Sequence, residues 1–241
     1  MTETITAEAT KITAASEAVK NVGSDCTATL YPEYGVIHLK GALSNKEQKA
    51  LWAKIKRKGV RDPAGANQTT TQFHVSSGTG ASKDEPLSEY GKLLYTRSAV
   101  ELAKQMSEED CRDEPSFKRL HQIISGVKPV NLNHISGIVY SKQANLRNHQ
   151  DIDKVFYTMT VSLGDDVEFT VGKKVGTYNN ERCGLPNKMR IKSGDAIFFD
   201  GGSIPHQVNR ILPDTGPQWW TEKRMKNGAR VVVIFREELE N

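Results

Sequence analysis

The stretch RVVVIFR, residues 230–236, carries the strongest indication of the fold. Its β-branched and aromatic residues predict a strand. Alternate side chains of a strand share one face, so Arg230 and Arg236 point the same way. An arginine inside a β core is costly unless an anion pairs with it, and a dicarboxylate suits the two-pronged guanidinium. The alternative, an edge strand with solvated arginines, is disfavoured by the apolar run between them.

Similar short apolar runs fill the chain from about residue 130 onward. They are separated by Gly, Asn, Asp and Pro, and they read VNLNHISGIVYS, VFYTMTVSLG, VEFTVG, AIFFDGG and HQVNRIL. Six or more short strands with turn residues between them are typical of an antiparallel sandwich or barrel. This half of the chain therefore predicts an all-β core.

Helical patterns dominate the earlier half, after a pair of short strands in ATLYPEYGVIHLKG. Ser44 with Glu47 forms a capping box, and Gly59 lies where the helix should end. Residues 88–106 and 114–126 predict two further helices. These helices are expected to support one face of the β core.

The remaining segments predict little regular structure. Residues 62–86 are rich in Gly, Ser, Thr and Asp and predict a long loop, which in a compact chain is usually functional or disordered. Residues 1–26 predict a mobile tail. The expected fold class is α+β, with one domain spanning 27–241.

The stretch RNHQDID, residues 147–153, places an imidazole and two carboxylates at period two. On a strand His149, Asp151 and Asp153 would share a face, which suits either a metal or a polar sheet surface. His206, which follows AIFFDGGSIP, would complete a set of two histidines and one carboxylate that binds Fe(II) and leaves open coordination positions. A loop histidine is the alternative for His206.

Composition restricts the class of protein. The chain has 241 residues, with 37% hydrophobic and 26% charged residues, as in a globular protein with its own core. The sequence contains no run of about 18 apolar residues, so we expect no membrane-spanning helix. The N-terminus lacks the apolar segment of a secretory signal. The three cysteines form no CxxC pair, so we expect a reducing intracellular compartment, cytoplasmic or nuclear.

Net charge is +4, which alone does not indicate nucleic acid. The basic residues are nevertheless clustered in three places, each of which is either a solvated face or a contact for a polyanion. The clusters are Lys54, Lys56, Arg57, Lys58 and Arg61; Lys188, Arg190 and Lys192; and Lys223, Arg224 and Lys226.

The order of these motifs resembles the AlkB family of Fe(II)/2-oxoglutarate dioxygenases. The resemblance covers about residues 128–237 and extends weakly to GVIHLKGALSNKEQKALW. It depends on the whole ordered set, which comprises Tyr140, His149-x-Asp151, VSLG at 161–164, SGDAIFF at 193–199, GGSIPHQV at 201–208 and R-x5-R at 230–236.

The resemblance implies a double-stranded β-helix, or jelly roll, in which His149, Asp151 and His206 bind iron. It further implies that Arg230 pairs with the distal carboxylate of 2-oxoglutarate. Arg236 would lie near the metal-bound end of the cosubstrate, and Tyr140 would donate a hydrogen bond to it. O2 and 2-oxoglutarate would then be consumed, and an N-methyl group would be hydroxylated and lost as formaldehyde.

The chain departs from the family at the cosubstrate and substrate positions. Ile138 stands where the family often has Asn, and Val232 and Ile234 replace polar residues between the arginines. Asp153 matches a family acid near the substrate base. Phe73 is a candidate for stacking on the base, with a core role as the alternative.

The sequence therefore predicts an oxidative demethylase of alkylated DNA or RNA bases, acting as a monomer without a membrane partner. The same iron chemistry on a protein side chain or a 5-methylpyrimidine is one alternative. A β-sandwich binding module that has lost turnover is another.

Overall fold

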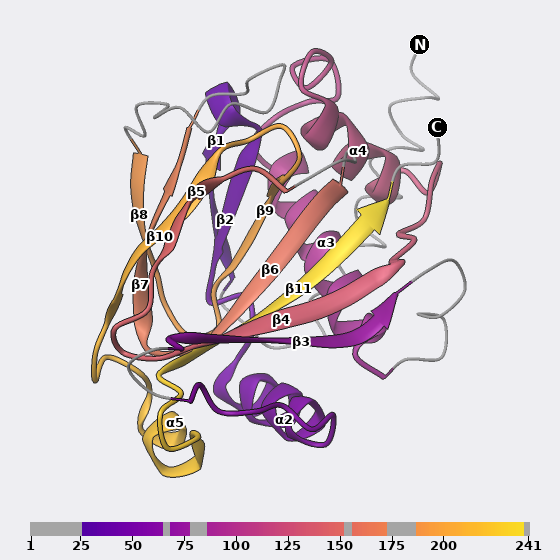
Figure 1. Cartoon of the computed structure of the whole chain (residues 1–241). Helices are drawn as coiled ribbons and strands as arrows, with labels where there is room; N and C mark the ends of the chain where they lie inside the picture. The colour runs from indigo at the N-terminus through magenta and orange to yellow at the C-terminus, as the bar shows by residue number, and fades with distance from the viewer. Residues whose placement is uncertain (1–25, 65–67, 78–85, 152–155, 173–186, 239–241) are drawn as a thin grey trace.

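The computed structural model describes residues 26–64, 68–77, 86–151, 156–172 and 187–238. Two antiparallel sheets face each other, and helices cover the outer face of the larger one (Figure 1). The larger sheet has seven strands in the order β1-β2-β9-β6-β11-β4-β3. The smaller has four strands in the order β5-β10-β7-β8. This arrangement confirms the expected jelly-roll core with supporting helices.

The strands of the larger sheet come from both halves of the chain. They are β1 (Thr27–Tyr31), β2 (Val36–Lys40), β3 (Thr70–Ser77), β4 (His134–Tyr140), β6 (Phe156–Gly164), β9 (Ala196–Asp200) and β11 (Arg230–Glu238). The strands of the smaller sheet are β5 (Leu146–His149), β7 (Asp166–Val171), β8 (Asn187–Ile191) and β10 (His206–Leu212). A short 3-10 turn, η1 (Pro32–Tyr34), joins β1 to β2.

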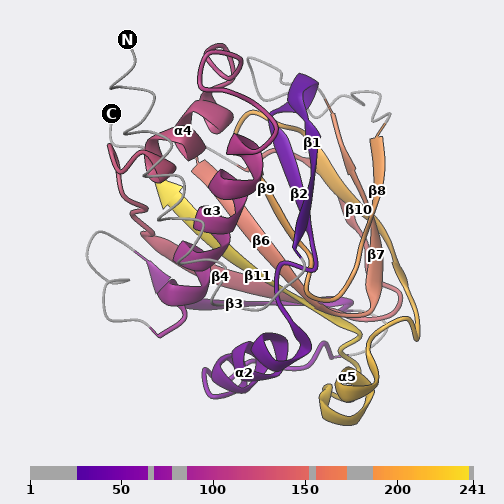
Figure 2. The same cartoon turned by 180° about the vertical axis from the view of Figure 1, so that it is seen from behind.

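Helices α3 (Ser88–Ala103) and α4 (Pro115–Ile124) lie against the larger sheet, and Figure 2 shows them in front of it. Helices α2 (Asn45–Lys56) and α5 (Gln218–Lys223) lie beside each other at one end of the sheets. None of the helices that the structure describes combines the length and apolarity needed to span a bilayer.

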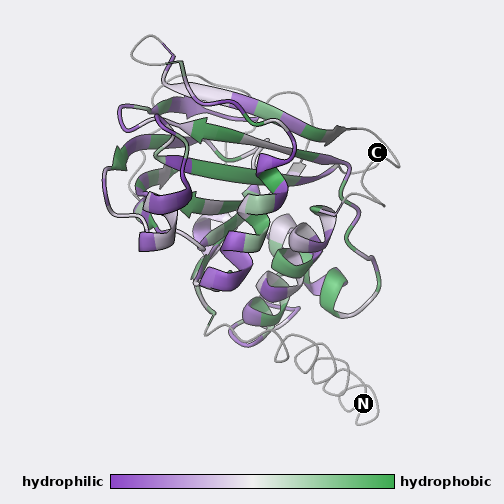
Figure 3. Ribbon diagram, turned by 90° about the horizontal axis from the view of Figure 1, so that it is seen from below, coloured by the Kyte–Doolittle hydropathy of each residue, from purple (hydrophilic) through white to green (hydrophobic). Residues whose placement is uncertain are grey.

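Alternation along the strands builds two apolar clusters on opposite faces of the larger sheet. In β11, Val231, Val233 and Phe235 pack toward the helices in the first cluster. In β9, Phe198 belongs to that cluster, whereas its neighbour Phe199 faces the smaller sheet in the second. Figure 3 shows green hydrophobic positions along the strands, whereas the helices carry both hydrophobic and hydrophilic stretches. The second cluster borders the space between the sheets.

The predicted helix starts are confirmed. The backbone N–H of Glu47 donates to the Ser44 hydroxyl, and the Ser44 backbone N–H donates to the Glu47 carboxylate at 2.7 Å. This reciprocal pair satisfies two donors that the first turn of α2 would otherwise leave free. Gly59 has a φ of +72°, in the left-handed region typical of a glycine just beyond a helix.

Two elements differ from the sequence prediction, and a third, β8, was not predicted. The segment 62–86 is not one loop, because it contains β3, an edge strand paired with β4. The strand expected through RNHQDID ends at His149, so β5 does not extend to Asp151. The basic stretch containing Lys188 and Arg190 forms edge strand β8. Edge strands tolerate polar residues, which is why their sequence pattern is weak.

Candidate active site

A cavity of about 460 Å³ lies between the two sheets. Its walls include His149, Asp151 and His206 together with both arginines of β11 and Tyr140 of β4. Six residues that the sequence singled out from separate segments therefore share one cavity. The remainder of the wall is mostly apolar and includes Leu146, Val167, Phe169, Ile191, Ile197, Phe199 and Val208.

Three potential metal ligands converge at one wall. The ligand atoms of His149, Asp151 and His206 all lie within 4.8 Å of one another. Asp151 Oδ1 is 3.9 Å from His149 Nε2 and 4.0 Å from His206 Nε2. Ligands about 2.0–2.2 Å from one ion can be at most about 4.4 Å apart, so both distances fit a shared metal. In the described part of the chain no other cluster of three such side chains was found.

The pairing of β5 with β10 brings the two histidines together. His206 lies directly opposite His149 in the antiparallel register, and their ring centroids are 4.2 Å apart. The Nδ1 atoms are 2.9 Å from the carbonyl oxygens of Arg147 and Ile204 respectively. A carbonyl accepts only, so each Nδ1 carries the proton and each Nε2 presents its lone pair toward Asp151.

The charge states also suit a metal. Burial lowers the pKa of His206 to about 4, so its imidazole is neutral and able to coordinate at neutral pH. Burial opposes ionisation of Asp151, but the neighbouring His206 and Arg236 together hold the pKa of the carboxyl below its usual value. The set thus provides two imidazole nitrogens and one carboxylate, which are the donors of an Fe(II) facial triad.

Arg236 holds the carboxylate from the other side. Its Nη2 donates to Asp151 Oδ2 at 2.7 Å, while Oδ1 faces the two histidines. One carboxylate oxygen is therefore engaged by a guanidinium and the other is turned toward the metal position. Such an outer contact orients a metal ligand.

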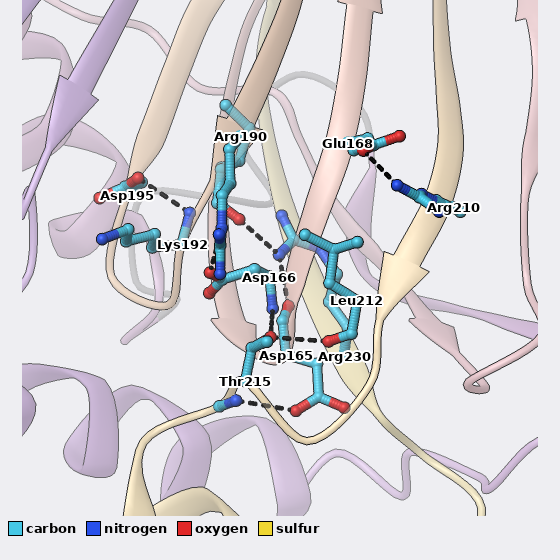
Figure 4. A network of polar contacts seen from close by, with 12 residues as sticks. Asp165, Asp166, Glu168, Arg190, Lys192, Asp195, Arg210, Leu212, Thr215 and Arg230 are labelled. Atoms are coloured by element: carbon cyan, nitrogen blue, oxygen red, sulfur yellow. Dashed lines mark hydrogen bonds and ion pairs between the residues drawn. The ribbon is translucent and has the colours of Figure 1, made fainter.

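Arg230 lies at the far end of β11 and is only 2% exposed. Its Nη1 donates to the carbonyl oxygen of Asp165 at 2.8 Å, and its Nη2 donates to the Ser162 hydroxyl. Figure 4 shows Arg230 beside Asp165, in a polar network that also contains Asp166. No carboxylate in the described part of the chain forms an ion pair with Arg230, and its Nε has no hydrogen-bond partner there.

A buried guanidinium without a counter-anion is a strong fit for an anionic ligand. Burial lowers the pKa of Arg230 to about 10, which still leaves it charged at neutral pH. Tyr140, opposite Arg230 in the strand register, is 3% exposed. Burial raises the pKa of Tyr140 well above its ordinary value, so its hydroxyl remains protonated and able to donate. A dicarboxylate fits this end of the cavity.

The structure describes only one of the two residues predicted to contact the substrate. Phe73 is 8% exposed and lies in the core cluster, because strand alternation turns it toward Gly137 and the helices. This corrects the expectation that Phe73 stacks on a base at the cavity. Its exposed neighbour His74 lines the cavity instead. Asp153 lies outside the described residues.

His134 was missed by the sequence analysis. It lines the cavity on β4, with its ring centroid 5.8 Å from that of His74. Burial, with Arg236 close by, lowers the pKa of His134. Counting back by twos along β4 from Tyr140 would have placed it on the cavity face.

The fold and the site together define an iron-dependent oxygenase that uses 2-oxoglutarate. The chain belongs to the 2OG-Fe(II) oxygenase superfamily, whose family model matches residues 35–236. It is therefore a dioxygenase with Fe(II) and 2-oxoglutarate as its cofactor and cosubstrate. A search of curated proteins gave no match.

The chain is also similar to solved structures. OsALKBH1 is 21% identical over 86% of this chain and 100% of its own, with a TM-score of 0.63, which shows that the fold is AlkB-like. An oxidoreductase of the 2OG-Fe(II) oxygenase family from Burkholderia pseudomallei is 16% identical over 84% of this chain and 85% of its own, with a TM-score of 0.48. A prolyl-4-hydroxylase from Pseudomonas putida is 14% identical over 86% of this chain and 94% of its own, with a TM-score of 0.46.

Proposed function

We propose that the chain oxidatively demethylates N-methylated bases of nucleic acid, with iron held by His149, Asp151 and His206. The observation that carries this proposal is the joining of two features in one cavity. Three convergent ligand atoms lie at one wall, and the buried, uncompensated guanidinium of Arg230 lines another. Iron and 2-oxoglutarate, when bound, would use O2 to hydroxylate a C–H bond: one oxygen atom would enter the substrate and the other would enter succinate, with carbon dioxide released.

The protein side chains bind and orient the reactants. Arg230 binds the distal carboxylate of the cosubstrate, and Tyr140 donates a hydrogen bond to it. Arg236 fixes the orientation of Asp151 and places positive charge near the opposite end of the cosubstrate. The apolar side chains of Ile138 and Val232 line the cavity and help to exclude water.

The N-methyl substrate is supported by the AlkB-like fold. Hydroxylation of an N-methyl carbon gives an N–CH2–OH group. Its C–N bond then breaks, with the hydroxyl proton moving to the base nitrogen, so that formaldehyde and the demethylated base leave. His74 and Gln72, both exposed, line the same cavity and are available for contacts with the base. Asp153 stays a predicted contact.

Measuring succinate and formaldehyde together tests the proposal. The purified chain, supplied with Fe(II), ascorbate, 2-oxoglutarate and air, should form both products in equal amounts with an N-methylated oligonucleotide. A 5-methylpyrimidine oligonucleotide and an N-methylated peptide are the comparison substrates, and DNA and RNA strands are tested side by side.

Each other outcome assigns a different function. Coupled turnover with the peptide or the 5-methylpyrimidine alone would replace the proposed substrate. Absence of succinate with every substrate, in protein shown to bind iron, would identify a binding module that has lost turnover.

A further inference from the structure

All three tryptophans of the chain gather where α2 meets α5, at one end of the sheets (Figures 1 and 2). The ring centroids of Trp52 and Trp220 are 5.0 Å apart, and those of Trp219 and Trp220 are 5.7 Å apart. The indole N–H of Trp52 donates to the carbonyl oxygen of Lys223 at 3.1 Å. These contacts fix the two helices side by side, although they are distant in the sequence.

A hollow of about 270 Å³ lies between the two helices. The hollow is lined by Lys49, Trp52, Ala53, Lys56, Trp219, Glu222 and Lys223. Trp52 and Trp219 are 3% and 6% exposed and form its aromatic floor, whereas the lysines around it are exposed. The hollow therefore combines an aromatic floor with a charged rim.

The charge of the rim is not neutralised. Three lysines face a single glutamate, and none of the three forms an ion pair within the described part of the chain. Lys56 Nζ lies 5.6 Å from the centre of the Trp52 ring, which is a cation–π contact. The buried Nε1 of Trp219 has no hydrogen-bond partner among the described residues, which leaves a donor for an incoming acceptor.

We propose that this hollow binds single-stranded nucleic acid, with successive phosphates on the three lysines and an adjoining base against the tryptophans. The proposal rests on the proposed function, because the strand is that of the substrate. Lysines supply sequence-independent contacts to phosphate, and aromatic side chains accept any base by stacking. One lysine from each of two basic clusters of the sequence, Lys56 at the end of α2 and Lys223 at the end of α5, lines this hollow.

The hollow is remote from the metal position. Trp220 donates its indole N–H to the Ala229 carbonyl at 2.8 Å, beside the first residue of β11, whereas Arg236 near the other end of β11 contacts Asp151. At a rise of about 3.3 Å per residue these ends are roughly 20 Å apart. Binding at the hollow therefore raises the affinity for a nucleic-acid strand, and the residues of the hollow take no part in the reaction itself.

The tryptophan fluorescence of the whole protein reports on this place alone, because the chain has no other tryptophans. Titration with an unmethylated single strand long enough to reach from the cavity to the hollow should quench that fluorescence to saturation. The titration is repeated at several salt concentrations. A variant K49Q/K56Q/K223Q removes the rim charges and keeps most of each side-chain stem. The control K104Q/K118Q/K128Q removes the same charge from the C-cap of α3, from α4 and from the segment after α4.

Each phosphate contact contributes about 0.7 to the salt slope for a single strand, so losing three should make the slope shallower by about 2. The control should keep the wild-type slope. Equal affinity and slope in the hollow variant and in the control would overturn the proposal. Polyglutamate that quenches as strongly as the strand at the same salt would also overturn it, in favour of an acidic protein partner.

The two proposals fail separately. Salt-dependent quenching without demethylation of any oligonucleotide would refute the demethylase and leave the hollow as a nucleic-acid site. Coupled demethylation with unchanged fluorescence would refute the hollow and leave the demethylase.

Discussion

Replacing Arg230 by alanine should remove most of the affinity for 2-oxoglutarate. The guanidinium is 2% exposed and no described carboxylate pairs with it, so the distal carboxylate of the cosubstrate would be its counter-ion. Truncating one partner of a buried, hydrogen-bonded charge pair costs about 2–5 kcal/mol. At about 1.4 kcal/mol per factor of ten, the dissociation constant should rise roughly thirty-fold to a few thousand-fold.

Calorimetric titration of 2-oxoglutarate into the Mn(II)-loaded protein measures this change without turnover. R230K should recover only part of the affinity, because an ammonium cannot form two parallel hydrogen bonds with a carboxylate. The matched control is R210A, which removes an exposed arginine of β10 that pairs with Glu168 at 2.7 Å. This control should bind 2-oxoglutarate as the wild type does.

Folding must be checked in R230A, because the side chain also donates to the Asp165 carbonyl and the Ser162 hydroxyl. Circular dichroism and metal content provide that check. Unchanged affinity for 2-oxoglutarate in folded, metal-loaded R230A would refute the assignment and make Arg236 the next candidate.

His206→Ala should abolish stoichiometric metal binding, measured by elemental analysis, whereas His74→Ala in the same cavity should retain the metal; loss of metal in both would contradict the ligand set. Gly137→Ala should lower the melting temperature, because an added Cβ would lie 2.3 Å from Phe73 Cζ and 2.4 Å from a backbone oxygen. Overpacking of this kind costs about 1–3 kcal/mol, and an unchanged melting temperature would show that Phe73 and the backbone of β11 can shift at no cost. Ser44→Ala should destabilise the protein by about 1 kcal/mol in denaturant unfolding, because it removes the cap of α2; Ser44→Asp, which can also cap, should restore most of that loss.

Local sequence patterns predicted those parts of the site that lie within one strand. Period two along β11 placed Arg230 and Arg236 on one face, and both line the cavity. His149 and Asp151 are also close, as their separation of two residues suggested, although β5 ends at His149 and Asp151 lies beyond it. Such inferences succeed because strand geometry alone determines which side chains share a face.

Features that depend on pairing between distant strands could not be obtained in this way. His206 meets His149 only because β10 pairs with β5, and no local pattern encodes that register. Edge strand β3 lies in a Gly- and Ser-rich segment that predicted a loop. The face of the sheet to which Phe73 and His74 each point therefore became known only from the pairing of β3 with β4. The hollow between α2 and α5 likewise required the contact between Trp52 and Trp220.

The position of β11 has a consequence for how the protein is assembled. It follows every other described strand in the sequence, yet it lies between β6 and β4 in the interior of the larger sheet. Until it inserts, β6 and β4 present unpaired edges to each other, and neither arginine is in the cavity. A nascent chain or a proteolytic fragment that ends before Arg230 therefore lacks both a closed sheet and an anchor for the cosubstrate. The strand that closes the larger sheet and the anchor predicted for 2-oxoglutarate are therefore supplied by the same nine residues, Arg230–Glu238.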